Sequence, residues 1–409
     1  MLENLLAASH LMPLELLPVR VNEHAASAGM SEVLIHVADL RRSRLLPLTG
    51  GGEGTARPAE GGEAGPAIEG TLPGRAYRDS RILADGSARA GEYRWWVPLL
   101  DGTERLGVLR VTTVTDDART LRDMTALASL ISLILVSKSG HSDFHARLTR
   151  LEPMNIATEM QWRLMPPRAY ADGRVVIAAA MEPAYRVSGD AYDYATAGST
   201  VHLSIFDAMG HDTAAGLTAN LAVSACRSAR HREAGLVEIT ERIEEALIEQ
   251  YGHTRYATGI LAHLDTRTGV FTWVNRGHHL PVLIRRGRWA GRLRCRPAHP
   301  MGTGLGLRIT PCREQLEPGD RVVLYTDGIT EARGRDGSEF GLERFIDFLI
   351  RHHADGLPVP ETLRRLVQAL LEYHDGPLRD DATVLFCEWV GSDPGTTATA
   401  AALTGLTPP

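Results

Sequence analysis

The sequence predicts an α+β protein in which antiparallel sheets are covered by helices. Runs typical of strands, apolar and bounded by turn residues, arrive as hairpin-like neighbours, for example HLDTRTGVFTWV at residues 263–274. Helical patterns come in long blocks and do not alternate strictly with single strands, which favours antiparallel sheets over a doubly wound parallel one. The length of 409 residues exceeds one ordinary domain, so we expect two.

The composition is that of a soluble globular protein, with 44% hydrophobic and 23% charged residues. A formal charge of −6 argues against nucleic acid as the main partner. The four cysteines include no C-x-x-C pair, which indicates a reducing compartment and no zinc ribbon. The N-terminus lacks the basic start of a signal peptide, and the apolar patch at residues 127–138 is too short and too interrupted by serine to span a bilayer. We therefore expect a cytoplasmic protein with no membrane partner.

The first unit, residues 1–137, combines strands with one long helix. Strand-like runs at 93–102 and 104–114 flank the turn Asp101-Gly102, which predicts a hairpin. The glycine-rich segment 49–67 lacks the Gly-Lys-Ser/Thr of a phosphate loop and is better explained as a surface loop. The apolar spacing over residues 116–136, with acidic residues at its start, predicts a helix buried on at least one face.

The segment 138–167 is predicted to be a helical connector. Gly140 and Pro153 interrupt its pattern, and two prolines stop it at residues 166–167. Apolar residues recur on roughly one face of it: Leu148, Leu151, Ile156, Met160 and Leu164. Two interpretations stay open, because such a stripe can pack on the chain's own domains or pair with a second copy of the chain.

The second unit, residues 168–391, alternates strand-like runs with four clear helical patterns, at 213–231, 235–251, 342–353 and 361–374. The tail, residues 392–409, carries no large apolar pattern, and we expect it to be disordered.

Aspartates recur beside the apolar strand-like runs of this second unit. The first, Asp190, follows the small pair Ser188-Gly189 at what reads as the end of a short strand. The others adjoin apolar runs in the same way: Asp207, Asp327 and the pair Asp380-Asp381. A single aspartate in such a place is more often a turn or helix-cap residue. Because strand ends of one sheet share a rim, the repetition predicts that these carboxylates converge.

Several carboxylates within a few ångströms repel one another and raise each other's pKa. A hard divalent cation removes that repulsion, and ligation by oxygen alone favours Mg²⁺ or Mn²⁺ over zinc or copper. Two such ions can hold a water between them and clamp a phosphate for in-line attack. The pattern therefore indicates phosphoester hydrolysis.

Five motifs in this unit resemble, in order and spacing, the SpoIIE/RsbU-like branch of the PPM (PP2C-type) serine/threonine phosphatases. They are VSGDAYDY, IFDAMGHDTAA, WVNRGHHLP, LEPGDRVVLYTDGITEARG and DDATVLF, and MQWRLMPP resembles the short helix that precedes the family's catalytic domain. The resemblance covers roughly residues 155–390. The first unit resembles a GAF sensor domain more loosely, mainly through RWWVPLLDGTERLGVLRV.

The resemblance to the phosphatases implies an αββα sandwich with a site for two Mn²⁺ or Mg²⁺ ions. The matching ligands are Asp190, Asp207, the backbone carbonyl of Ala208, Asp327 and Asp380. Asp207 suits a bridging role, Asp381 is expected to hold the turn, and Asp193 to support or cap. The implied nucleophile is a metal-bound water, so no side chain forms a covalent intermediate.

The sequence departs from the family motifs at three places. Ser188 replaces a glycine, which the turn tolerates if its φ is negative. Gly210-His211-Asp212 replaces Gly-His/Lys-Gly, and Asn275-Arg276-Gly277-His278 replaces Asn-Ala-Gly-His. None of these changes removes an expected ligand. Arg186 is a candidate phosphate-binding residue, although a surface salt bridge explains it as well.

The leading hypothesis is a metal-dependent protein serine/threonine phosphatase regulated by the N-terminal domain. The resemblance suggests a phosphorylated regulator, such as an anti-sigma factor antagonist, as substrate. Two alternatives stay open: a catalytically silent scaffold with the phosphatase fold, and a two-metal hydrolase of small phosphoesters. A small-molecule ligand of the GAF-like domain and a homodimer formed through the connector are further expectations.

Overall fold

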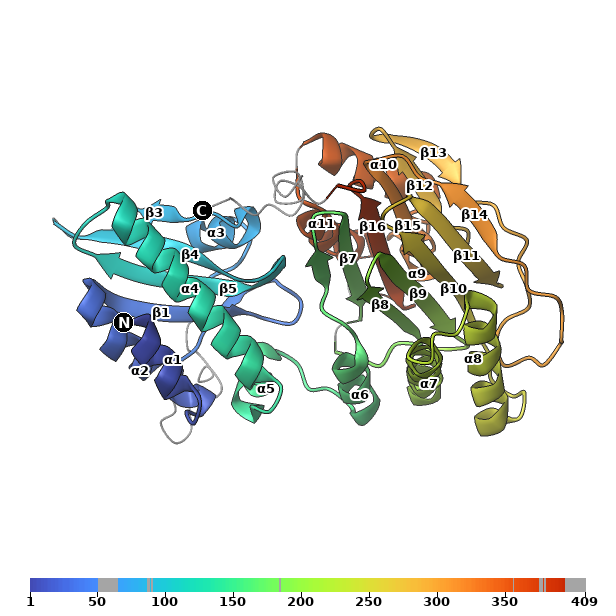
Figure 1. Cartoon of the computed structure of the whole chain (residues 1–409), viewed down its shortest axis with the longest axis horizontal. Coiled ribbons are helices and arrows are strands. Elements are labelled where there is room, and N and C mark those ends of the chain that lie inside the picture. Colours follow the sequence, from blue (N-terminus) through green and yellow to red (C-terminus); the bar gives the residue numbers. More distant parts are fainter. Residues whose placement is uncertain are drawn as a thin grey trace. The chain divides into compact units, whose positions relative to one another are not determined.

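A computed structural model describes residues 1–50, 65–86, 89, 91–183, 185–355, 357–374, 378 and 380–393. Within these residues the chain divides into two compact units, at Pro153 and Met154 (Figure 1). The division falls inside the segment 138–167 that the sequence predicts as a connector. Most of the predicted tail 392–409 and most of the predicted loop 49–67 lie outside the described residues.

The first unit is built on one antiparallel sheet with the strand order β2-β1-β5-β4-β3. Its strands are β1 (Met30–Ala38), β2 (Leu45–Pro47), β3 (Leu83–Asp85), β4 (Tyr93–Asp101) and β5 (Glu104–Thr113). Its helices are α1 (Leu2–Ser9), α2 (Leu17–Ala25), α3 (Leu72–Asp79), α4 (Ala118–Ser139) and α5 (Asp143–Thr149), with two 3₁₀ turns, η1 (Leu14–Leu16) and η2 (Ala26–Ala28). The predicted hairpin is present, and Gly102 at its tip has a φ of +56°.

The main core of this unit lies where α2 and α4 pack on the sheet and α1 packs on both helices. The α4 helix begins after Asp117, whose side chain accepts a hydrogen bond from the Thr120 amide as an N-cap. Of the helices in the described residues, α4 alone is long and apolar enough, by length and composition, to cross a membrane. Its apolar face instead belongs to the core of this unit, through Met124, Leu127 and Ile131 among others. The likeness of this unit to a GAF domain stays a prediction.

The second unit contains two antiparallel sheets. The first has the order β14-β11-β10-β9-β8, and the second the order β13-β12-β15-β16-β7-β6. The strands of the first sheet are β8 (Asp190–Ala197), β9 (Thr200–Ala208), β10 (Ala257–Asp265), β11 (Val270–Arg276) and β14 (Cys312–Gln315). Those of the second are β6 (Ala169–Ala171), β7 (Val175–Glu182), β12 (Val282–Arg285), β13 (Arg288–Arg292), β15 (Asp320–Tyr325) and β16 (Ala382–Trp389).

Helices cover the outer face of each sheet (Figure 1). The first sheet carries α7 (Thr213–Arg230) and α8 (Leu236–Tyr251), with α6 (Ile156–Leu164) packed against α7. The second sheet carries α10 (Leu342–Ala354) and α11 (Val359–His374), and a single turn, α9 (Asp327–Thr330), follows β15. The predicted αββα sandwich is confirmed.

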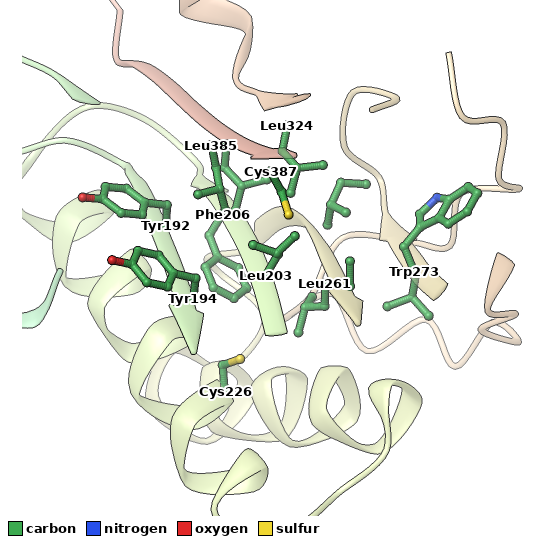
Figure 2. Packing of buried hydrophobic residues seen from close by; sticks show 14 of the residues in the cluster. Tyr192, Tyr194, Leu203, Phe206, Cys226, Leu261, Trp273, Leu324, Leu385 and Cys387 are labelled. Carbon is green, nitrogen blue, oxygen red and sulfur yellow. The ribbon is translucent and has the colours of Figure 1, made fainter. Parts of the chain in front are cut away.

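One apolar cluster fills the space between the two sheets and continues under α7, on the outer face of the first sheet. Figure 2 shows Leu203 and Phe206 of β9 together with Leu324 and Leu385 of the other sheet, and Cys226 on α7. A second cluster fills the space between β7, β15 and β16 and the helices α10 and α11. Each sheet is thus buried on both faces, and its strand ends are left as the exposed edge on which a site can form.

The structure corrects the prediction for Asp190. This residue opens β8 and does not end a strand, and the sequence DYATA that follows it is extended. Aspartate and alanine are poor strand formers, so the pattern favoured a turn, but pairing with β9 over the full length of β8 decides the conformation.

The structure also corrects the expectation drawn from the cysteines. Cys295 and Cys312 form a disulfide across 17 positions of the chain, while Cys226 and Cys387 are free and buried. The expectation rested on the absence of a C-x-x-C pair. The structure corrects only the implied absence of a disulfide, because the chain returns from β13 to β14 and brings two distant cysteines together.

Candidate metal centre

The candidate site is the set of five aspartates at one edge of the sandwich, here called the aspartate rim: Asp190, Asp207, Asp327, Asp380 and Asp381. Asp190 at the start of β8 is the register partner of Asp207 at the end of β9. Asp327 follows β15 after one intervening residue, and the pair 380–381 directly precedes β16. Because β15 and β16 are antiparallel neighbours, the end of one and the start of the other share an edge.

The electrostatics show that carboxylates from both sheets lie near one another. Burial, followed by repulsion from Asp207 and Asp381, raises the pKa of Asp190 well above its usual value. Burial raises the pKa of Asp207 to about 7, with further contributions from Asp327, Asp380 and Asp381. Burial and Asp380 raise the pKa of Asp327. Burial is the largest cause for Asp381 as well, whose pKa rises to about 6. The rim therefore gathers negative charge without enough local compensation.

Small residues let the backbone close in around the rim. A Cβ atom on Gly189 would lie 2.4 Å from the Gly210 carbonyl oxygen and 2.8 Å from that of Ala208. The Ala208 amide donates to the Gly189 carbonyl at 2.9 Å. Ser188 does not have a positive φ, so its replacement of the family's glycine is tolerated. The Ala208 carbonyl is thereby held beside the turn that leads into Asp190.

Two hydrogen bonds join the sheets at the rim. The Thr326 hydroxyl, just before Asp327, donates to Asp190 Oδ2 at 2.6 Å. The Gly189 amide donates to Asp381 Oδ2. In addition, a Cβ atom on Gly328 would meet the Asp381 carbonyl oxygen at 2.0 Å, so the turn after β15 presses against the turn before β16. These contacts hold the rim as one unit.

The donor set of the rim fits hard divalent cations, because every candidate ligand is a carboxylate or carbonyl oxygen. Among the described residues, no group of three or more histidine, cysteine, aspartate or glutamate side chains is already arranged to hold a metal ion. Mg²⁺ usually takes only one or two protein carboxylates and keeps several waters, so it does not need three converged side chains. The burial of Asp207 and the carboxylates around it, which together raise its pKa to about 7, favour a cation there.

A glutamine that the sequence reasoning missed supports the rim from α6. The Gln161 side chain is buried, and its amide nitrogen donates to the carbonyls of Ser188, at 2.9 Å, and Asp190, at 2.6 Å. Its oxygen accepts from the Ser188 amide at 3.2 Å. The predicted helical connector and the segment MQWRLMPP both pointed to this helix, but nothing in the spacing pointed to the hydrogen-bond partners of Gln161.

Other predicted residues fall in different places. Asp193 is buried under α7, where it forms ion pairs with Arg227 at 2.6 Å and Arg230 at 2.9 Å. Asp212 is the N-cap of α7, because its side chain accepts from the Ala215 amide. Arg186 is exposed. Its phosphate-binding role stays a prediction, as does the set of metal ligands.

Arg276, one of the departures from the family motif, is fully buried and structural in its contacts. Its guanidinium forms an ion pair with Glu244 and donates to the His299 carbonyl at 2.8 Å. Glu244 in turn accepts from the Gly304 amide at 2.8 Å. Arg276 therefore ties α8 to the chain that follows β13, and it does not point at the aspartates.

Comparison with known proteins identifies relatives of the second unit. Residues 197–390 match the family described as "Stage II sporulation protein E (SpoIIE)". A curated relative, the phosphoserine phosphatase RsbU of Bacillus subtilis, is 23% identical over 234 residues, which is 57% of this chain and 68% of RsbU.

Solved structures are similar over the same part of the chain. The SiaA-PP2C domain of Pseudomonas aeruginosa is 23% identical, with 57% of this chain and 94% of that chain covered and a TM-score of 0.48. The PP2C phosphatase domain of SpoIIE from Bacillus subtilis, solved with a fragment of its regulatory domain, is 22% identical. There the match covers 54% of this chain and 63% of that chain, with a TM-score of 0.44.

Proposed function

We propose that the protein is a PP2C-type (PPM) phosphatase that hydrolyses phosphoserine and phosphothreonine in a protein substrate with the help of two Mn²⁺ or Mg²⁺ ions. Support comes from the match of residues 197–390 to the SpoIIE family. The observation that carries the proposal is the aspartate rim, in which burial and neighbouring carboxylates raise the pKa of Asp190, Asp207, Asp327 and Asp381.

The proposed ligands are Asp190, Asp207, the Ala208 carbonyl, Asp327 and Asp380. Bound there, the ions would supply Lewis-acid polarisation of the phosphoryl oxygens and a more acidic water. The chain's own contribution is to hold the ligands in place. Thr326 orients the Asp190 carboxylate. The Gly189 amide holds the Asp381 side chain, which neighbours the proposed ligand Asp380. Water adds to phosphorus, and the serine or threonine alcohol leaves with a proton.

A comparison of substrates tests this proposal. Release of phosphate from a phosphoserine peptide is measured with Mn²⁺, with Mg²⁺ and with EDTA, beside release from nucleotide monophosphates. We expect metal-dependent turnover of the peptide. A preference for the nucleotides would instead support a hydrolase of small phosphoesters. If no phosphoester is hydrolysed with either metal ion, only the hypothesis of a catalytically silent scaffold remains.

The proposed substrate is a phosphorylated regulator, such as an anti-sigma factor antagonist, in the cytoplasm. Support comes from the relative RsbU, which is named a phosphoserine phosphatase. A panel of phosphorylated antagonist proteins from one organism, each presented at equal concentration, measures the preference. Equal rates on all of them and on an unrelated phosphoprotein would contradict a dedicated substrate.

Regulation by the N-terminal unit, through a small-molecule ligand or another input, is proposed to reach the rim through α6. Gln161 bonds the backbone on both sides of Gly189, so a shift of α6 moves the turn that carries Asp190. Gln161→Leu keeps the approximate volume and removes all three bonds. With this substitution, we expect the full chain and a shortened chain of residues 154–393 to have the same phosphatase activity. A difference that persists in the Leu variant would contradict this route.

Self-association through the connector is proposed from the surface of α6. Ile156 is 80% exposed and Met160 49% exposed. Beside Met160 lies a cavity of about 410 Å³ whose wall includes Asn220 of α7. Light scattering should give a dimer for the wild type and a monomer for Ile156→Asp, and a monomeric wild type would contradict the proposal.

A further inference from the structure

His278 lies between the two sheets that supply the aspartate rim. Its ring is buried, with Nδ1 at 2.8 Å from the Thr258 hydroxyl and Nε2 at 3.1 Å from the Tyr325 carbonyl oxygen. A carbonyl oxygen only accepts, so Nε2 carries the proton and Nδ1 accepts from Thr258. Burial lowers the pKa of His278 to about 3, which keeps the ring neutral in this arrangement.

The two partners of His278 each adjoin a different aspartate of the rim. Thr258 on β10 is the register partner of Asp207 on the neighbouring strand β9. Tyr325 is the last residue of β15, two positions before Asp327. The ring therefore connects the strand beside Asp207, in one sheet, to the strand end before Asp327, in the other.

The backbone around His278 fixes the direction of the ring. The Asn275 side chain donates to the His278 carbonyl at 2.9 Å and accepts from the His278 amide at 2.8 Å. Gly277 between them has a φ of +71°, a conformation that favours glycine. The two hydrogen bonds from Asn275 therefore fix the backbone of this turn, and with it the orientation of the imidazole toward its two partners.

We propose that His278 is a positioning residue of the metal centre, which sets the placement of Asp207 relative to Asp327 and thereby the affinity for Mn²⁺ or Mg²⁺. The inference deepens the proposed function, because it rests on the same rim. Residues that position the metal ligands without touching the metal typically contribute about 10–100-fold to metal affinity.

Two substitutions separate the two ends of the ring. An asparagine oxygen at position 278 can replace Nδ1 as acceptor from Thr258, so His278→Asn should lose only the bond to Tyr325. A glutamine nitrogen reaches as far as Nε2, so His278→Gln should keep the bond to Tyr325. The dissociation constant for Mn²⁺ is measured by calorimetry on the full chain, and folding by circular dichroism. We expect His278→Asn to weaken binding about 10-fold or more, and His278→Gln to weaken it less.

The matched control is His299→Gln, at another buried histidine, which bonds Glu244 and not the residues beside the rim. We expect it to lower the unfolding temperature and to leave the Mn²⁺ affinity within about twofold. Thr258→Val serves if the variants at 278 do not fold, and it should also weaken binding about 10-fold or more. Wild-type affinity in folded His278→Asn or, in its place, Thr258→Val, would overturn the proposal whatever happens to stability.

The outcomes also distinguish this inference from the proposed function. Wild-type protein that binds Mn²⁺ but hydrolyses no phosphoester would refute the phosphatase proposal and leave the role of His278 standing. Wild-type protein that binds no Mn²⁺ would overturn both.

Discussion

Asp190 and Asp193 lie three positions apart on β8, and both are buried, yet their surroundings differ. The carboxylate of Asp193 is 1% exposed and forms ion pairs with Arg227 and Arg230 of α7. Asp190, at 2% exposure, has other carboxylates nearby, and its pKa is raised. In the described part of the chain, the one basic side chain within 4.0 Å of a rim carboxylate is His279, near Asp327. A buried charge that the protein compensates serves structure, and a buried charge that it leaves uncompensated indicates a missing cation.

The largest expected effect is on catalysis. Asp207→Asn replaces a negatively charged proposed ligand with a neutral amide. The kcat/KM for a phosphoserine peptide should therefore fall by more than ~100-fold, which is the upper effect typical of residues that only hydrogen-bond a metal ligand. Asp212→Asn is the matched control, because Asp212 is exposed and caps α7. An Asp207→Asn enzyme within tenfold of wild type at saturating Mn²⁺ would refute the ligand role.

The second effect concerns stability and separates the two aspartates directly. Asp193→Ala leaves two guanidinium groups without their partner and should reduce the free energy of unfolding by about 3–5 kcal/mol. Asp190→Asn should leave the stability of the metal-free protein unchanged or raise it, because it removes a repelled charge. Urea unfolding in EDTA measures both, and equal losses in the two variants would remove the contrast.

A third effect is the pH dependence of the metal-free protein. The pKa of Asp207 is raised to about 7 from 3.8, so its protonated form contributes stability that is full below pH 3.8 and lost as pH rises through 7. The stability of wild type minus that of Asp207→Asn should therefore fall by a few kcal/mol between pH 5 and pH 8, at ~1.4 kcal/mol for each unit of pKa shift. Taking the difference also removes the pH-dependent contribution of three histidines that are the same in both proteins and whose pKa is lowered to about 4: His36, His202 and His263. A flat difference would contradict the assigned shift.

The smallest expected effect comes from substitutions in the turn at Gly189, which leads into Asp190. Gly189→Ala forces a Cβ atom against two backbone carbonyl oxygens and should cost about 1–3 kcal/mol of stability. Gly210→Ala is the comparison, because Gly210 has a positive φ of +88° but open space around its Cβ position. Mn²⁺ binding should weaken more in the first variant than in the second, since only the first moves the Ala208 carbonyl. Equal effects would show that backbone strain alone explains them.

The sequence was sufficient for those features that depend on local pattern. The apolar spacing of α4, α7 and α10 and the turn at Asp101-Gly102 predicted elements that the structure contains. The αββα layering followed from the resemblance of five motifs, since periodicity alone indicated only antiparallel sheets with external helices.

The features that the sequence missed depend on pairing between distant segments. The strand conformation of β8 comes from β9, and the disulfide comes from the return of the chain to β14. Asp193 resembled a supporting residue of the site because it lies close to Asp190 in sequence. On a strand, however, residues separated by three positions face opposite sides, so Asp193 faces α7. The bridging role of His278 could not be seen either, because Thr258 and Tyr325 are 20 and 47 positions away.

The central claim is that a cation completes the aspartate rim. Anomalous diffraction from crystals grown with Mn²⁺ tests it most directly. The account predicts anomalous peaks within ligand distance of Asp190, Asp207, Asp327 and Asp380, in one pocket between the ends of β8 and β9 and those of β15 and β16. Fully occupied Mn²⁺ sites elsewhere on the protein, with the rim carboxylates apart and metal-free, would contradict it.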